Sequence, residues 1–205
     1  MQVVRSGSRA VAFALAAMIG AGGLAVLVER SASQGHRAPE AGEEAPVGSR
    51  FILTTHEGRT VTDGELHGRH LLVFFGYTHC PDVCPTSLLT VAQVLELLGA
   101  AAERVQPVFI TVDPARDTPE VLAAFVSHFD PRILGLTGPE AMIERVAKGY
   151  RVKYERRPAE RDGFYTVDHT ASMFHIGPSG EYLGRFGYET PAEGIAARLR
   201  AALGG

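Results

Sequence analysis

Short apolar runs alternate with polar connections along most of the chain, and their spacing predicts strands and helices in turn. Two runs, residues 71–75 (LLVFF) and 105–112 (VQPVFITV), are rich in aromatic and branched side chains, as strands covered on both faces are. Between them, the apolar positions over residues 91–98 recur with the period of a helix. The central part of the chain is therefore expected to form a strand, a helix and a second buried strand.

The flanking segments extend this pattern in both directions. Residues 50–54 and 60–61 are expected to pair as a hairpin around Glu57 and Gly58. Further along, Thr118 as a cap and Pro119 at the first helical position predict a helix to about residue 129. The other expected elements are a strand at 133–136, a helix at 139–149, a weak strand at 152–154, a charged loop to 162, a strand at 170–176, a hairpin strand at 182–186 and a final helix after Thr190. This order predicts a three-layer α/β fold with an N-terminal hairpin.

The first 46 residues differ from the rest in composition. Residues 11–28 are apolar and uncharged, just long enough to span a bilayer, and Arg5 and Arg9 precede them. The expected layout is a cytoplasmic segment at 1–10, a single transmembrane anchor at 11–28, a flexible tether at 29–46 and a folded domain at 47–205. A cleaved signal peptide is the alternative, and it would leave a soluble exported domain.

Both cysteines of the chain, Cys80 and Cys84, follow the first buried strand. Gly76 ends that strand, and Pro81 and Pro85 stiffen the turn that follows. The free N–H groups of a first helical turn favour negative charge and lower the pKa of a nearby thiol. Because thiolate is both a nucleophile and a metal ligand, this turn is the candidate site. A plain structural disulfide or a pair of buried small side chains is the alternative.

Two thiolates favour Cu(I), zinc or an iron–sulfur cluster, but two cysteines alone complete neither a zinc nor a cluster site. Among the histidines, His169 is the best placed third ligand, because it precedes a strand expected beside the central sheet. His79 adjoins Cys80, but neighbouring residues on an extended chain point apart. Met142 and Met173 are expected in the core rather than at a metal. The residue pattern leaves the third ligand open.

Composition narrows the function classes. The formal net charge is −3, so no basic excess argues for nucleic acid. Two cysteines are too few for a disulfide scaffold. Both interpretations of the N-terminus export the domain to a place where thiols need active reduction to stay free.

The chain resembles the SCO/SenC family of copper chaperones for cytochrome c oxidase assembly. Four segments carry the resemblance, in the family's order and spacing, and they cover nearly all of residues 47–203. They are FFGYTHCPDVCPTSL (74–88), FITVDPARDTPEVL (109–122), LTGPEAMIERVAKGYRV (136–152) and VDHTASMFHIGPSGEYLGRFGY (167–188). The charged segment 155–161 is more basic than is typical of the family.

The resemblance implies a thioredoxin-like fold that binds one copper ion, as Cu(I) and also as Cu(II). It implies the thiolates of Cys80 and Cys84 and the imidazole of His169 as ligands, and a redox-active disulfide between the two cysteines. Residues expected beside the ligands are Asp82, Asp168 and His79, with Asp82 as a residue that tunes the site or reaches Cu(II).

The implied role is that of a metallochaperone rather than an enzyme. It would deliver copper to the Cu(A) centre of cytochrome c oxidase, or keep the cysteines of that centre reduced. The implied partners are the Cu(A) subunit and other copper carriers or thioredoxin-like reductants, at a bacterial inner membrane with the domain facing the periplasm.

Three alternatives use the same residues. A membrane-tethered thiol–disulfide reductase of the thioredoxin type would cycle the two sulfurs through a mixed disulfide. A peroxidase would need an arginine to activate one cysteine, for which Arg116 is the candidate. A structural zinc module is disfavoured, because only three ligands are identified.

Overall fold

The computed structural model of the chain describes residues 47–158 and 165–204. The expected cytoplasmic segment, transmembrane anchor and tether lie outside the described residues. Within the described ranges, the helical stretch Val83–Arg104 has the length and apolar composition to cross a membrane. Its buried side chains belong to the core of the domain, and a core helix meets the same criteria.

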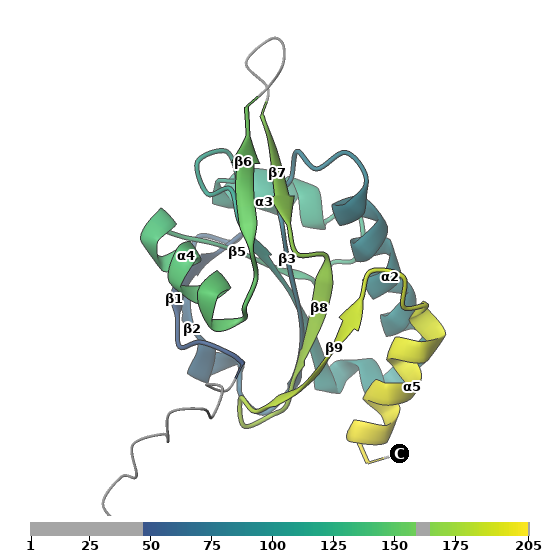
Figure 1. Cartoon of the computed structure of the whole chain (residues 1–205). Helices are drawn as coiled ribbons and strands as arrows, with labels where there is room; N and C mark the ends of the chain where they lie inside the picture. The colour runs from purple at the N-terminus through teal and green to yellow at the C-terminus, as the bar shows by residue number, and fades with distance from the viewer. Residues whose placement is uncertain (1–46, 159–164, 205) are drawn as a thin grey trace, which may run out of the picture. The chain divides into compact units, whose positions relative to one another are not determined.

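A seven-stranded mixed sheet forms the centre of the domain, with strand order β2-β1-β5-β4-β3-β8-β9 (Figure 1). Its strands are β1 (Ile52–Thr55), β2 (Thr60–Thr62), β3 (His70–Gly76), β4 (Val105–Thr111), β5 (Leu134–Thr137), β8 (Ser172–Ile176) and β9 (Tyr182–Gly187). β3, β4 and β5 run parallel, and the remaining neighbours pair antiparallel. Every residue of β3 and β4 is buried, as their continuous apolar runs predict.

Helices cover both faces of this sheet. They are α2 (Val83–Leu98), α3 (Pro119–Val126), α4 (Glu140–Gly149) and α5 (Ala192–Ala202), with short 3-10 helices η1 (Asp63–Leu66) and η2 (Gly99–Arg104). On one face, Phe109 of β4 packs against Phe125 of α3, and α5 lies along α2. On the other face, Tyr150 at the end of α4 packs against Phe75 and Phe174 (Figure 1). The predicted three layers and N-terminal hairpin are therefore present.

The start of α3 follows its local sequence signal. Thr118 caps α3, where its hydroxyl accepts a hydrogen bond from the Val121 amide at 3.4 Å, and Pro119 takes the first helical position. α3 ends at Val126, earlier than expected. Met142 and Met173 pack into or against the core, as predicted.

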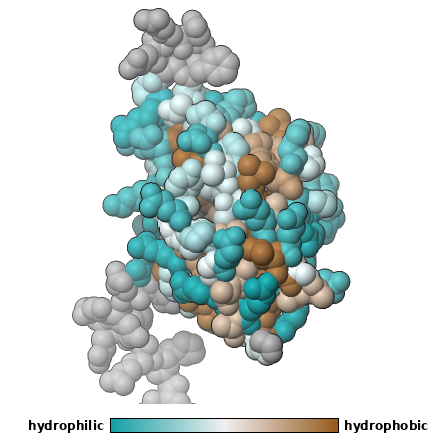
Figure 2. Space-filling view, turned by 90° about the vertical axis from the view of Figure 1, so that its right-hand side faces the viewer, coloured by the Kyte–Doolittle hydropathy of each residue, from teal (hydrophilic) through white to brown (hydrophobic). Residues whose placement is uncertain are grey.

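The outer face of α2 and α5 is a mixed surface. Figure 2, which looks onto that side of the domain, shows apolar side chains in small separate groups among polar ones. The exposed large apolar residues of α2 are Leu89 and Leu97. Scattered exposure of this kind is normal for a water-facing surface.

Two further strands, β6 (Tyr154–Arg157) and β7 (Thr166–His169), form a separate antiparallel ribbon that extends from one end of the domain (Figure 1). The expectation of a charged loop was wrong for residues 155–157, which are paired with β7. The expected strand at 170–176 was wrong at its start, because β8 begins at Ser172.

The ribbon was missed because it is stabilised by polar contacts rather than by the burial of apolar side chains. Across its two strands only Val167 is buried. Arg157 instead forms ion pairs with Glu155 at 3.1 Å and with Asp168 at 2.8 Å. A strand without alternating apolar residues gives no period-two signal, so the pattern resembled a loop.

Two buried histidines lie at the end of the sheet away from the cysteines. His70 Nδ1 and His175 Nε2 are 2.9 Å apart, and the two residues are 6% and 4% exposed. Burial lowers the pKa of His70, helped by the positive charge of Arg104. Burial, with His70 and Arg198, lowers the pKa of His175 to about 4, and Glu181 acts weakly against both shifts. Both rings are therefore neutral in the folded protein at pH 7.

This pair predicts that acid destabilises the domain. An unfolded histidine takes up a proton below about pH 6.5, whereas the folded His175 stays neutral until about pH 4, so stability falls between these values. We expect His175 to account for a loss of about 2 kcal/mol of unfolding free energy between pH 7 and pH 5, measured by urea unfolding.

The substitution His175→Gln should flatten this pH dependence. The matched control is His128→Gln, because His128 is exposed. If the stability of the His175→Gln variant falls with pH as steeply as that of the wild type, the pair does not carry the acid sensitivity.

Candidate metal centre

The two cysteines lie in the thiol turn, residues 77–84, between the end of β3 and the first turn of α2. The Cys80 amide donates to the Tyr77 carbonyl at 3.2 Å and closes the turn. The Cys84 amide, one of the free donors of the first helical turn, donates to the Cys80 sulfur at 3.3 Å. Both thiols are buried and free. The predicted placement of the thiols at a strand-to-helix turn is confirmed.

Gly76 makes room for one of the sulfurs. A Cβ atom at this position would lie 2.6 Å from the Cys84 sulfur and 2.8 Å from the ring of Phe109. The sequence pattern marked Gly76 only as the residue that ends the strand. The structure shows that the absent side chain lets α2 bring its sulfur down onto the sheet.

His169 is the last residue of β7 and faces the thiol turn. Its Nε2 lies 3.4 Å from the Cys84 sulfur, and its Nδ1 lies 3.3 Å from the Thr170 carbonyl. A ring nitrogen beside a carbonyl carries the hydrogen, which leaves Nε2 as the ligand atom. The ring packs edge-on against Phe74 and Tyr77, at centroid distances of 6.0 and 5.9 Å.

The ligand atoms of Cys80, Cys84 and His169 all lie within 4.8 Å of one another. Over the described ranges, no other group of three histidine, cysteine or acidic side chains meets this criterion. Ligands at ordinary sulfur and nitrogen bond lengths around one three-coordinate ion are roughly 3.8 Å apart, so the cluster fits a single metal. Two sulfurs and an imidazole suit a soft ion, and three donors fall short of a closed zinc site.

The two thiols differ strongly in acidity. The pKa of Cys80 is lowered to about 4, first by a hydrogen bond from the Cys84 thiol and then by His169 and backbone amides, against the effect of burial. The pKa of Cys84 is raised by that same bond, by burial and by the negative charge on Cys80. Without metal, the pair therefore holds one negative charge and one proton at pH 7, and a bound cation displaces the proton.

The residues expected beside the ligands make contacts of their own. The His79 ring is exposed, and its Nδ1 lies 3.0 Å from the Thr78 hydroxyl. Asp82 is exposed at the start of α2 and accepts from a threonine hydroxyl one turn on, at 3.4 Å. Asp168 is exposed on the ribbon and accepts from Arg157 at 2.8 Å. Their influence on the metal stays a prediction.

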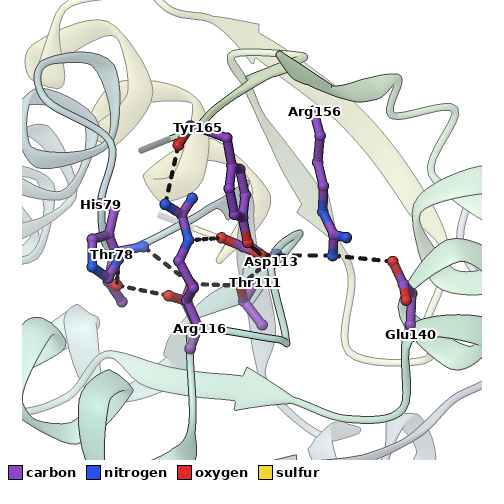
Figure 3. A network of polar contacts seen from close by, with 9 residues as sticks. Thr78, His79, Thr111, Asp113, Arg116, Glu140, Arg156 and Tyr165 are labelled. Carbon is purple, nitrogen blue, oxygen red and sulfur yellow. Dashed lines mark hydrogen bonds and ion pairs between the residues drawn. The ribbon is translucent and has the colours of Figure 1, made fainter. Parts of the chain in front are cut away.

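A polar network beside the site was not predicted (Figure 3). Its acids, Asp113 and Asp117, are fully buried in the connection between β4 and α3. Burial raises the pKa of Asp117, against hydrogen bonds from Thr111 and Thr78. Arg116, the candidate activator of a peroxidase, contacts Asp113 and stacks on a tyrosine ring. The available signal was an acid two residues after a buried strand, with a second acid four residues further on, where buried carboxylates need partners.

A thiol pair at a strand-to-helix turn, with an imidazole beside it, defines an α/β domain of the thioredoxin-like class with a site for a soft metal. The chain belongs to the SCO1/SenC family, whose sequence profile matches residues 39–204. This confirms the family that the sequence segments indicated.

Relatives of known structure support the fold assignment. The structure of Bradyrhizobium japonicum ScoI with copper bound is 44% identical, covering 76% of this chain and 99% of that one, with a TM-score of 0.71. The crystal structure of yeast Sco1 with copper bound is 32% identical, covering 78% and 89%, with a TM-score of 0.72.

A human relative, "Protein SCO1 homolog, mitochondrial", is 43% identical over 155 residues, which are 75% of this chain and 52% of that protein. The chain thus spans about half the length of this curated relative.

The space at Gly76 can be tested directly. Gly76→Ala would drive a methyl group against the Cys84 sulfur, and we expect the free energy of unfolding to fall by about 1–3 kcal/mol, as in other overpacked cores. The measurement is urea unfolding of the metal-free, reduced domain.

The control for this test is Gly187→Ala at the end of β9. A Cβ atom there would meet nothing closer than 4.0 Å. Equal stability of the two variants would show that Gly76 is not needed as a spacer.

Proposed function

We propose that the chain is a copper chaperone that acts in the assembly of cytochrome c oxidase. In this proposal it binds one copper ion through Cys80, Cys84 and His169, and delivers it to the Cu(A) centre or keeps the cysteines of that centre reduced. The observation that carries the proposal is the approach of two sulfurs and one ring nitrogen to within 4.8 Å. Membership of the SCO1/SenC family and the copper in two related structures support copper as the ion.

The ligand set suits the capture and release of a soft ion. Cys80 offers a thiolate, Cys84 becomes one when it gives up its proton, and the His169 ring offers Nε2. With Cu(I) the centre has a net charge of minus one. Three donors leave the ion open to a fourth ligand, so a competing thiol can attach before the first ligands leave.

Oxidation of the two thiols to a disulfide removes both anionic ligands, so copper loading and disulfide formation exclude each other. The low pKa of Cys80 favours a second candidate function, a membrane-tethered thiol–disulfide reductase in which this thiolate attacks a partner disulfide and Cys84 resolves the mixed disulfide. The ring of His169 has no required part in that chemistry.

The remaining expectations stay with this proposal. Residues 11–28 would anchor the domain 47–205 to a bacterial inner membrane through the tether 29–46, with the domain facing the periplasm, or would be cleaved to release it. The proposed partners are the Cu(A) subunit of the oxidase and other copper carriers or thioredoxin-like reductants.

Replacing either sulfur should abolish tight Cu(I) binding. Cys80→Ser and Cys84→Ser each remove a soft anionic ligand, and we expect the loss of stoichiometric Cu(I) in a competition assay with a Cu(I) chelator. Stoichiometric Cu(I) in the double variant would refute the ligand set.

Replacing the imidazole should affect the binding of Cu(II) and Cu(I) to different degrees. His169→Ala is expected to weaken Cu(II) more than Cu(I), because nitrogen ligands matter more to the harder ion. His128→Ala is the control, since His128 is exposed and is not among the residues placed at the site. Equal losses for both ions would count against this role, and disulfide-reductase activity that ignores His169→Ala would favour the second candidate.

A further inference from the structure

The thiol turn and His169 belong to parts of the domain that no shared sheet joins. Among the described strands, β6 and β7 pair only with each other, and neither belongs to the seven-stranded sheet β2-β1-β5-β4-β3-β8-β9. His169 therefore reaches the sulfurs from the end of a two-stranded ribbon. A two-stranded ribbon on its own holds its direction poorly, so other contacts must set where the imidazole lies.

The connection between β4 and α3, residues 112–118, lies beside both parts (Figure 3). At one end of it, Asp117 accepts from the Thr78 amide at 3.0 Å and from the Thr78 hydroxyl at 2.6 Å. The Thr111 hydroxyl donates to the same carboxyl at 2.6 Å. Because Asp117 is fully buried and Thr78 is two residues before Cys80, these bonds fix the start of the thiol turn.

Two other residues of the connection, Asp113 and Arg116, hold Tyr165, the residue directly before β7. The Tyr165 hydroxyl donates to Asp113 at 2.7 Å, and the Tyr165 carbonyl accepts from Arg116 at 3.0 Å. The Arg116 guanidinium lies 3.6 Å from the centre of the Tyr165 ring and pairs with the Asp113 carboxylate. Tyr165 is thus held through its backbone carbonyl, its ring and its hydroxyl. Strand β7 begins at the next residue and ends at His169.

The ribbon has a second, weaker hold on the same acid. Arg156 of β6 lies 3.7 Å from Asp113 and 3.1 Å from Glu140 of α4. Its side chain is 41% exposed, and that of Glu140 is 66% exposed, so the pair with Glu140 contributes little, while the pair with Asp113 is long. The part-buried hydrogen bonds of Tyr165 are therefore the stronger of the two holds on this connection.

We propose that Asp113, Arg116 and Asp117 act as positioning residues that set the distance between the thiol pair and the His169 ring. They do so because one connection, residues 112–118, is bonded both to the thiol turn and to the ribbon. The inference rests on the copper site of the proposed function. It assigns Tyr165 to the placement of the imidazole and Thr78 to the placement of the sulfurs, although neither residue is a ligand.

The test uses Tyr165→Phe, which removes the hydroxyl and keeps the ring under Arg116. The matched control is Tyr182→Phe, because Tyr182 is exposed on β9. We expect Tyr165→Phe to weaken Cu(II) binding by about three- to tenfold, with Cu(I) affected less and the control unchanged. This is less than the full effect of one hydrogen bond to a charged group, because only the part that positions the imidazole is felt at the metal. Thr78→Val should do the reverse and weaken Cu(I) more.

A double-substitution cycle separates positioning from general stability. If Tyr165 acts through the imidazole, Tyr165→Phe should have no further effect on copper affinity once His169→Ala is present. An undiminished effect in the His169→Ala background would overturn the proposal, because the hydroxyl would then act by another route.

A metal-free measurement keeps the two proposals distinguishable. In the reduced apoprotein, Tyr165→Phe should shift the His169 imidazole resonances in an NMR spectrum and leave those of His128 in place, whereas Tyr182→Phe should shift neither. Unmoved His169 resonances would overturn the positioning role even if copper binds. If the wild type binds no copper but the His169 resonances shift as expected, the proposed function fails and the positioning role stands.

Discussion

The contact between the Cys84 sulfur and the His169 ring joins two parts of the domain with different kinds of stability. The sulfur comes from a helix packed against β3 and β4, two parallel strands that are buried along their whole length. The imidazole comes from a ribbon that is exposed, polar and held by ion pairs. The buried strands and their helix fix the two thiols, and the ribbon brings the imidazole to them. The distance between the sulfurs and the imidazole therefore depends on how the ribbon is attached.

A second constraint comes from charge. Two buried thiolates without a cation would repel each other, and the thiol pair avoids this by sharing one proton between unequal sulfurs. The amide at the start of α2 points at the sulfur that bears the charge, and a polar group from the ribbon completes the site. The arrangement is stable with a proton in place and is complete when a metal ion replaces it.

Sequence patterns predicted the parts of this structure that depend on apolar burial. The runs at 71–75 and 105–112, the proline-bracketed cysteines and the cap at Thr118 each carry a local signal, and each lies where expected. The ribbon was not predicted, because Glu155 and Arg157 are polar strand residues whose pairing depends on partners distant in sequence.

The supporting residues of the site were missed for a related reason. Gly76 looks like any strand-ending glycine until a helix places a sulfur against it, and Asp117 looks like a loop acid until Thr78 and Thr111 surround it. His169 was chosen among the histidines by its place in the chain, but its distance from the sulfurs is set by the tertiary structure.

The unequal burial of the two sulfurs has a consequence for thiol exchange and oxidation. Cys84 is wholly enclosed and Cys80 retains 8% of its surface, so a thiol or oxidant that approaches from solvent meets Cys80 first.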